Sequence, residues 1–180
     1  TDVRVRAAVA LAFDFDWLNQ HVFYNRRART QSYFQNTDDL MAGETLTPQE
    51  LEMAARLPQT AALLAALREP VFSSAETGGT PEGLRKNLVQ AQHLLGDAGW
   101  RFRDGALRDT EGKAFVITML IPDRSSEVVL APYARNLMRL GITLRYRLSD
   151  ASLIKKRLDD FDFDMAINIL GGSTSPGNEL

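Results

Sequence analysis

The sequence contains no cysteine and only two histidines among its 180 residues. Without cysteine, the chain can form neither a disulfide framework nor a thiolate metal site. His21 and His93 each fall in an expected helix, and neither has a second histidine at the spacing of a zinc ligand pair. These absences fit an oxidising or a reducing compartment, and they predict no zinc centre and no histidine-based catalytic pair.

Long apolar runs and a strong charge of one sign are also missing. No apolar run approaches the roughly 18 residues of a helix that spans a membrane. The formal net charge is −2, which gives no electrostatic reason to expect binding to nucleic acid or to an anionic membrane. We therefore expect no nucleic-acid partner.

Motifs of catalysis and phosphate binding are missing as well. The sequence has no Gly-x-Ser-x-Gly elbow, and Gly78, Gly79 and Gly83 do not lead into the Gly-Lys-Ser/Thr ending of a phosphate loop. The aspartates at 159–164 lack the Asp-x-Asp-x-Asp-Gly pattern of a calcium loop, so the solvation of a helix end and a strand start explains them better. The sequence predicts neither an enzyme nor a bound metal or cofactor.

The chain does have the length and the apolar content of a folded domain. Its 180 residues are 44% hydrophobic, which suits one domain with a proper core. The sequence starts at Thr1, inside a helix signal, and shows no export signal. We therefore expect residues 1–180 to be a single lobe from a longer protein.

The stretch 98–112 organises the rest of the sequence. Gly99 provides a left-handed helix stop, after which aromatic and arginine residues alternate over 100–103 as in a strand with one apolar face. Asp104-Gly105 is a hairpin turn signal. The apolar, β-branched run 114–121 follows and is typical of a buried central strand.

Strand and helix patterns alternate from that point onward. Expected strands at 114–121, 142–148 and 163–170 are separated by expected helices at 125–140 and 150–159. This order implies parallel strands joined by helical crossovers. The expected fold class is α/β, or α+β in some schemes, with a mainly parallel β-sheet covered by helices.

The first half of the chain carries helix signals and one flexible stretch. Thr47-Pro48-Gln49-Glu50 is a capping box with proline at the first helical position. Residues 70–81 have the composition of a flexible loop. The remaining expectations are helix caps at Asp2, Asp16, Ser125 or Ser126, and Asp150, helices at 60–68 and 81–98, and an inward face of Val3, Ala7, Ala10 and Leu11 on the first helix.

Three segments, taken in order, carry a resemblance to a known family. They are the opening 2–14, the run of Ala-Gly-Trp, Asp-Gly and Gly-Lys within 98–113, and the closing 161–166. Together they resemble the second lobe of the solute-binding proteins of peptide ABC importers, the dipeptide and oligopeptide type of family 5. The segment 29–36 is similar to the Yej-type branch, which is linked to oligopeptides and to peptide antibiotics of the microcin C kind.

The resemblance implies an architecture and a set of partners. The fold would be one lobe of a type II periplasmic-binding-protein-like fold, and the first lobe would belong to the missing part of the same chain. The partners would be an oligopeptide or peptide-like ligand and an ABC permease in the membrane. The location would be periplasmic, with the signal peptide outside these residues.

A polar loop at 24–36 is the first candidate ligand wall. It is long and rich in arginine and aromatic residues, which is typical of binding loops. The alternative is an ordinary surface loop with Phe34 tucked into the core. The candidate ligand-binding residues here are Arg29, Thr30, Gln31, Ser32, Tyr33 and Phe34.

The second candidate wall follows the last expected strand. In open α/β sheets, ligands sit off the carboxyl ends of strands, and glycines there expose backbone groups to a ligand. In the family that this chain resembles, an aspartate of this segment holds the peptide amino terminus, whereas the matching position here is Ser173. The alternative is a plain exit loop. The candidates are Asn168, Gly171, Gly172, Ser173 and Ser175.

The favoured function is therefore that of a binding module, the substrate-binding component of an ABC importer that delivers oligopeptides to a permease. A second hypothesis keeps the fold but makes it a solute-binding-like sensor domain of a cytosolic transcription regulator. A third, more distant hypothesis is a hydrolase that acts on peptides.

Overall fold

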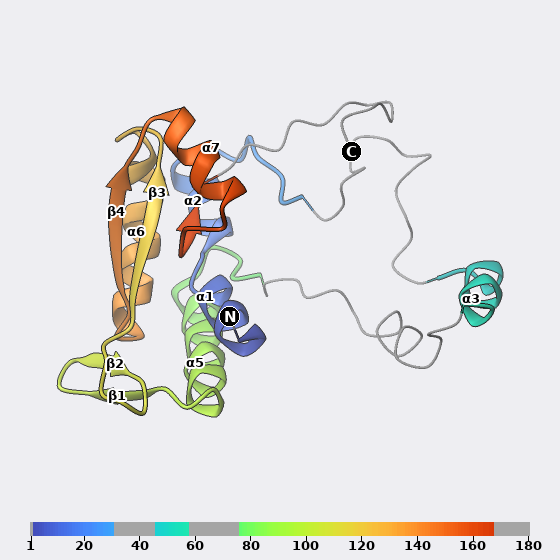
Figure 1. Ribbon diagram of the computed structural model, residues 1–180, viewed down its shortest axis with the longest axis horizontal. Coiled ribbons are helices and arrows are strands. Elements are labelled where there is room, and N and C mark those ends of the chain that lie inside the picture. Colours follow the sequence, from blue (N-terminus) through green and yellow to red (C-terminus); the bar gives the residue numbers. More distant parts are fainter. Residues whose placement is uncertain (1, 31–45, 58–75, 168–180) are drawn as a thin grey trace. The chain divides into compact units, whose positions relative to one another are not determined.

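The computed structural model describes residues 2–30, 46–57 and 76–167 of the chain (Figure 1). The chain divides into two compact units. The first consists of Thr1–Ala28 with Ser74–Ile169, and the second of Arg29–Ser73 with Leu170–Leu180. Each unit is described by itself, and the expectation of a single lobe stays a prediction.

A three-stranded parallel sheet forms the centre of the first unit. Its strands are β3 (Val116–Ile121), β4 (Thr143–Leu148) and β5 (Met165–Ala166), in the order β4-β3-β5. The parallel α/β fold predicted from the sequence is therefore confirmed. The central strand begins two residues later than expected, because Ala114 instead forms an antiparallel bridge with Arg108.

The third strand is shorter than the sequence predicted. Only Met165 and Ala166 pair with β3, opposite Met119 and Leu120, whereas the prediction ran over 163–170. Its first half was wrong because the side chain of Asp164 accepts the hydrogen bond from the Thr118 amide (2.9 Å) that a strand residue would have taken with its carbonyl. Residues 168–170 lie outside the described part of the chain.

Five helices accompany this sheet in the described part of the first unit (Figure 1). Helix α6 (Ser126–Arg139) connects β3 to β4, and α7 (Ala151–Asp159) connects β4 to β5. Helices α1 (Val3–Leu11), α2 (Phe15–His21) and α5 (Pro81–Asp97) precede the sheet. None of the helices in the described residues has the length and apolar character needed to cross a bilayer.

The hydrophobic core lies between one face of the sheet and α1, α5 and α6. Alternation along β3 directs every second side chain to this face, so β3 buries its odd-numbered residues there, with Leu144 and Tyr146 of β4 beside them in the register. The core includes Ile117, Met119 and Ile121 of β3, Ala8 and Leu11 of α1, Leu88, Ala91 and Leu95 of α5, and Leu130, Tyr133 and Leu137 of α6.

Two buried polar side chains of α6 bind the end of α1. The Tyr133 hydroxyl donates to the Val9 carbonyl (3.1 Å), and Asn136 Nδ2 donates to the Ala12 carbonyl (3.0 Å). The Val9 carbonyl also accepts from the Ala12 amide (3.3 Å), so Tyr133 is its second donor, whereas Asn136 satisfies a carbonyl at the helix end, where partners within the helix run out. Burial raises the pKa of Tyr133, so its hydroxyl keeps the proton that it donates.

The hairpin predicted at 104–105 is present. Strands β1 (Arg101–Arg103) and β2 (Ala106–Arg108) pair in antiparallel fashion, and both turn residues have positive φ, 50° at Asp104 and 76° at Gly105. The expected apolar face is only partly formed. Trp100 stacks on Phe115 with ring centroids 4.3 Å apart, but Phe102 stays 62% exposed.

Three predicted helix caps are confirmed. Asp2 accepts a hydrogen bond from the Arg4 amide (2.8 Å), and its bonds with the Arg4 side chain lower the pKa of Asp2 to about 2. Asp150 accepts from the Leu153 amide (3.0 Å) at the start of α7. In the second unit, the capping box forms at the start of α3 (Pro48–Ala55), where the Thr47 and Glu50 side chains each bind the other's amide.

Asp16 does not cap α2 as predicted, because Asp14 occupies that position and accepts from the Trp17 amide (3.1 Å). Asp16 instead accepts hydrogen bonds from the amides of Thr77 (2.7 Å) and Gly78 (2.8 Å). The end of the stretch that we expected to be flexible is therefore bound to α2.

The same short helix also holds the chain on its other side. Asn19 of α2 exchanges two hydrogen bonds with the backbone of Arg27, at 2.8 Å and 3.1 Å. Gln20, the next residue, donates to the Gly78 carbonyl (3.2 Å). The chain thus leaves the first unit and returns to it at points that are both bound to α2.

Two further local predictions were wrong. Ser125 makes no side-chain cap on α6, because Asp123 accepts from the Ser125 amide (2.7 Å) and fixes a different turn. The inward face of α1 was also misplaced. The helix carries small apolar residues on all sides, so their spacing does not indicate which face is buried. The structure leaves Val3 66% exposed and buries Val5, Ala8, Val9 and Leu11.

Helices α5 and α6 end in the same backbone motif. Each is followed by a glycine in the left-handed region, Gly99 with φ 92° and Gly141 with φ 80°. In each case the residue after the glycine donates its amide hydrogen bond to a carbonyl of the last helical turns. That residue is apolar, and so is the residue whose carbonyl accepts the bond. These bonds join Trp100 to Leu95 (3.0 Å) and Ile142 to Leu137 (3.0 Å).

We predict that Leu137→Ala lowers the free energy of unfolding by about 2–5 kcal/mol, because the side chain is fully buried and its removal leaves a cavity. The neighbouring change Met138→Ala should alter it by no more than about 0.5 kcal/mol, since Met138 is 69% exposed. Urea unfolding of both variants measures the difference. Equal losses would show that α6 does not pack as described.

A second prediction concerns Gly141. A Cβ there would lie 2.6 Å from the Leu107 amide nitrogen and 2.8 Å from the Phe102 ring, so Gly141→Ala should destabilise the chain by about 1–3 kcal/mol beyond its backbone strain. Gly112→Ala is the control, because Gly112 also has a positive φ but has nothing within 4 Å of the added atom. Thermal unfolding that cannot separate the two variants would contradict the close approach of the hairpin.

Candidate functional site

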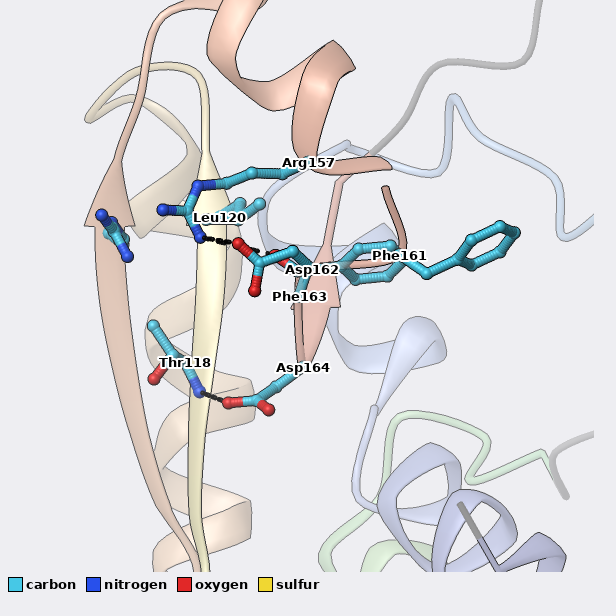
Figure 2. Close-up of a pocket in the computed structure, with 8 residues that line it drawn as sticks. Thr118, Leu120, Arg157, Phe161, Asp162, Phe163 and Asp164 are labelled. Carbon is cyan, nitrogen blue, oxygen red and sulfur yellow. Dashed lines mark hydrogen bonds and ion pairs between the residues drawn. The ribbon is translucent and has the colours of Figure 1, made fainter. Parts of the chain in front are cut away.

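A hollow of about 400 Å³ lies beside β5, on the face of the sheet opposite the core (Figure 2). We call it the β5 hollow. Strand β5 leads directly into the segment 168–175 that the sequence predicts to bind ligand, which makes the hollow the candidate site in the described residues. It is lined by Thr118, Leu120, Arg147, Arg157, Phe161, Asp162, Phe163 and Asp164.

The floor of the hollow is formed by β3 and β4. Thr118 and Leu120 alternate with the core residues of β3, so they point to the other face of the sheet. Leu120 is only 2% exposed, and Arg147 of β4 lies beside it in the register of the sheet. An apolar side chain and a cation thus adjoin on this floor.

Asp164 fixes the edge of the hollow. Its Oδ2 atom accepts the hydrogen bond from the Thr118 amide, which Figure 2 shows as the lower dashed line. The bond satisfies a strand amide at the point where pairing with β5 has not yet begun. Asp164 therefore has a structural task, and its carboxylate is already engaged.

The wall of the hollow comes from the end of α7, where the backbone motif of α5 and α6 recurs. Phe161 adopts a φ of 54° in the position that glycine holds in the other two helices. Its amide donates to the Leu158 carbonyl (3.2 Å), and the Asp162 amide donates to the Arg157 carbonyl (2.9 Å). A side chain in this left-handed conformation costs about 1–2 kcal/mol relative to glycine.

The motif brings an ion pair together instead of an apolar contact. Arg157 Nη1 lies 2.8 Å from Asp162 Oδ2 and reaches over β3 to do so (Figure 2). The Arg157 side chain is 21% exposed, whereas that of Asp162 is 70% exposed. Arg157 Nε is buried and has no hydrogen-bond partner among the described residues.

Two aromatic residues border the same space. Phe161 is 86% exposed and points away from the sheet (Figure 2), while Phe163 is 39% exposed. Exposed aromatic side chains are uncommon at the end of a helix that faces solvent, because burying a large aromatic side chain contributes more free energy of folding than burying a small one.

The chemistry of the hollow is that of recognition. Two guanidinium groups face two carboxylates, and the lining includes no pair of nucleophile and base within hydrogen-bonding distance. Within the described ranges, no group of three or more His, Asp or Glu side chains could hold a metal ion. Arginines, backbone groups and aromatic edges suit a ligand with carboxylate or amide groups.

Neither of the two predicted ligand-binding residues that the structure describes lines the β5 hollow. Arg29 is half-buried and Thr30 exposed, and both belong to the second unit rather than to the β5 hollow. The structure therefore leaves the two-walled site untested. The remaining candidates lie outside the described residues: Gln31, Ser32, Tyr33, Phe34, Asn168, Gly171, Gly172, Ser173 and Ser175.

The sequence favours solvation of a helix end and a strand start as the role of the aspartates in 159–164. That interpretation suits Asp159, which pairs on the helix surface with Lys155 (3.0 Å). It missed the bonds of Asp162 and Asp164 with Arg157 and β3. The available signal was a helix that stops without a glycine, with opposite charges five residues apart across the stop.

A second hollow of about 500 Å³ lies between α2, the start of α5 and α6. Its lining includes Trp17 and His21, whose rings stack 4.5 Å apart, and the arginines Arg135 and Arg139 of α6. None of its lining residues belongs to β5 or to the lining of the β5 hollow.

Comparison with known families gives a match over the whole chain. Residues 1–180 match the model of bacterial extracellular solute-binding proteins, family 5 Middle. A putative binding protein of Brucella suis is 34% identical over 181 residues, covering 99% of this chain. A probable peptide-binding protein YejA of Agrobacterium fabrum is 31% identical over 180 residues, covering 98% of this chain.

The chain spans 28% of the length of each of these two relatives. Among solved structures, the oligopeptide-binding protein AppA from Bacillus subtilis, in complex with a nonapeptide, matches with a TM-score of 0.61 and 19% identity. The match covers 97% of this chain and 29% of that chain. At this identity the likeness shows the fold.

We predict that Asp164→Ala speeds hydrogen exchange of the Thr118 amide by about tenfold, because the amide loses its only described acceptor. Asp160→Ala is the control, since Asp160 is exposed and does not line the hollow. Exchange followed by NMR in both variants gives the comparison. An unchanged Thr118 rate in Asp164→Ala would show that another group protects this edge.

Proposed function

Because this chain belongs to the bacterial extracellular solute-binding proteins of family 5, we propose that it forms one wall of a peptide-binding cleft in the receptor of an ABC importer. The resemblance seen in the sequence, including its Yej-type branch, is confirmed by the family match and by the YejA relative. This is a family of solute-binding proteins, and the comparisons lend no support to the transcription regulator.

One observation carries the proposal. The glycine-rich segment 171–177 follows the carboxyl end of β5, in a parallel sheet, after four intervening residues. Ligands of open α/β sheets bind off the carboxyl ends of the strands, and glycines allow the backbone of a peptide to approach. The β5 hollow, with its arginines and aromatic side chains, is lined by residues 161–164, which immediately precede the same strand.

The ligand class is inferred from the relatives together with this chemistry. One relative is named a probable peptide-binding protein, and the AppA structure holds a nonapeptide. A peptide offers the amide and carboxylate groups that backbone and arginine donors recognise. An oligopeptide or a peptide-like molecule is therefore the proposed ligand.

The proposed mechanism is closure of two lobes on that ligand. The receptor's first lobe would come from other parts of the longer protein, and the lobes would close about a hinge. This chain would contribute binding groups and no catalytic step. The closed receptor would deliver its cargo in the periplasm to a permease in the membrane, with export directed by a signal peptide outside these residues.

Two loops are proposed to meet the ligand. The segment 29–34 offers a cation, hydroxyl groups and aromatic faces, the mixture that recognition surfaces favour. The segment 170–175 offers two glycines, which a ligand can approach closely, with Ser173 where relatives in the family use an aspartate for the peptide amine. We propose that the ligand lacks a free amine at that place or that another lobe supplies the charge.

We predict that the full-length receptor binds a mixed oligopeptide pool, whereas the isolated chain shows no affinity tighter than about 10 μM. Half a cleft leaves much of the ligand in water, while the entropic cost of immobilising it remains. Calorimetry on both proteins tests this. Submicromolar binding by the isolated chain would contradict the two-lobe proposal, and absence of binding to the receptor would contradict the peptide ligand.

A variant pair makes this experiment specific to the proposed wall. In the receptor, Gly172→Val adds bulk where the backbone should approach the ligand, whereas Gly172→Ala adds little. The valine variant should bind more weakly than the alanine variant, with melting temperatures close to that of the parent. Equal affinities with normal melts would remove this loop from the proposed site.

A further inference from the structure

The ion pair at the end of α7 differs from its counterparts at the other helix ends. The backbone motif places the residue after the left-handed position against the residue five places earlier in the sequence. In α5 and α6 these two positions are apolar, and in α7 they are Arg157 and Asp162. The backbone itself therefore presents a carboxylate to Arg157.

The bonding of Arg157 is incomplete. A guanidinium has five N–H donors in a fork that matches both oxygens of one carboxylate. Here a single oxygen of Asp162 lies within 3 Å of Nη1, the Asp162 carbonyl is at 3.5 Å, and Nε is buried without a partner in the described ranges. A carboxylate that engages the fork with both oxygens would bind better than Asp162 does.

A second cation lies in the same hollow. Arg147 lines it from β4, and no carboxylate of the described residues lies within 4 Å of its guanidinium. Asp164, the other acid in the lining, is bound to the Thr118 amide. The hollow thus holds two guanidinium groups and one carboxylate that is free to move, Asp162.

Displacing Asp162 costs little. Its side chain is 70% exposed, so the released carboxylate returns to water and regains its hydration. Arg157 is far less exposed, at 21%, so an arriving anion would meet it in a partly dehydrated space. The balance favours exchange of the internal carboxylate for an external one.

We propose that the β5 hollow is a carboxylate subsite of the ligand cleft, in which Asp162 occupies Arg157 until a carboxylate of the peptide displaces it. The inference rests on the proposed peptide-binding function. Arg157 and Arg147 hold the anion, Phe163 borders the adjoining side chain, and about 400 Å³ accommodates one residue. The carboxylate is either the peptide's carboxyl terminus or an acidic side chain.

The test uses the full-length receptor and three peptide pools of equal length. The first has free carboxyl termini and no Asp or Glu; the second is the same pool as carboxyl-terminal amides; the third contains Glu and is amidated. Arg157→Met should weaken binding of at least one acid-bearing pool by about tenfold or more and leave the neutral amide pool unchanged. Asp162→Asn should strengthen binding of the same pool about two- to fivefold.

Lys156→Met is the matched control, because it removes one charge from the neighbouring exposed position of α7 without touching the hollow. Arg157→Lys, which keeps the charge but loses the fork, should recover part of the affinity. Thermal melts of each variant separate binding effects from unfolding. A response of the first pool alone identifies the carboxyl terminus as the source, and a response of the third alone identifies an acidic side chain.

The outcomes separate this inference from the function on which it rests. If all pools bind the receptor and Arg157→Met behaves as Lys156→Met does, the carboxylate subsite is wrong and the peptide receptor stands. The same conclusion follows if Asp162→Asn weakens binding of the acid-bearing pools, because the aspartate would then support the site. If no pool binds the parent receptor, the proposed function fails and the subsite with it.

Discussion

The alternation of side chains along β3 is the constraint on which the first unit depends. This central strand pairs with β4 along one edge and with β5 along the other. The pairing fixes its register and therefore which side chains lie on each face of the sheet. Ile117, Met119 and Ile121 enter the helical core, while Thr118 and Leu120 form the floor of the β5 hollow. A shift of one residue would exchange the two faces, placing a threonine in the core and the isoleucines in the hollow.

The ends of α5, α6 and α7 show how one backbone motif serves two purposes. After α5 and α6, a glycine turns the chain and an apolar pair closes the core, which is a purely structural use. After α7, the same geometry is kept with Phe161 in the turn, and the enclosed pair is charged. The strained Phe161 and the partly dehydrated Arg157 both lie just before β5, the strand that precedes the predicted ligand segment. Strained backbone is often found at functional sites.

The sequence predicted the parts of the fold that depend on neighbouring residues. The capping box at Thr47 and the hairpin at Gly105 each use partners within a few positions, so the local pattern was sufficient. The roles of Asp14 and Asp16 could not be separated, because the amides that engage Asp16 belong to Thr77 and Gly78, which are 61 and 62 positions away. The candidate site was missed for the same reason, since Arg157 and Asp162 meet only through the turn at the end of α7.

Helix α2 has a consequence for how this chain can vary. It binds Arg27, where the chain leaves the first unit, and Thr77 and Gly78, where the chain has returned. Because both points are bound to one short helix, the segment between them begins and ends at fixed positions whatever its length. Doubling the length of such a segment raises the entropic cost of closing it by only about 0.6 kcal/mol. Descendants of one ancestral gene could therefore lengthen, shorten or replace this insertion while inheriting the sheet and its helices unaltered.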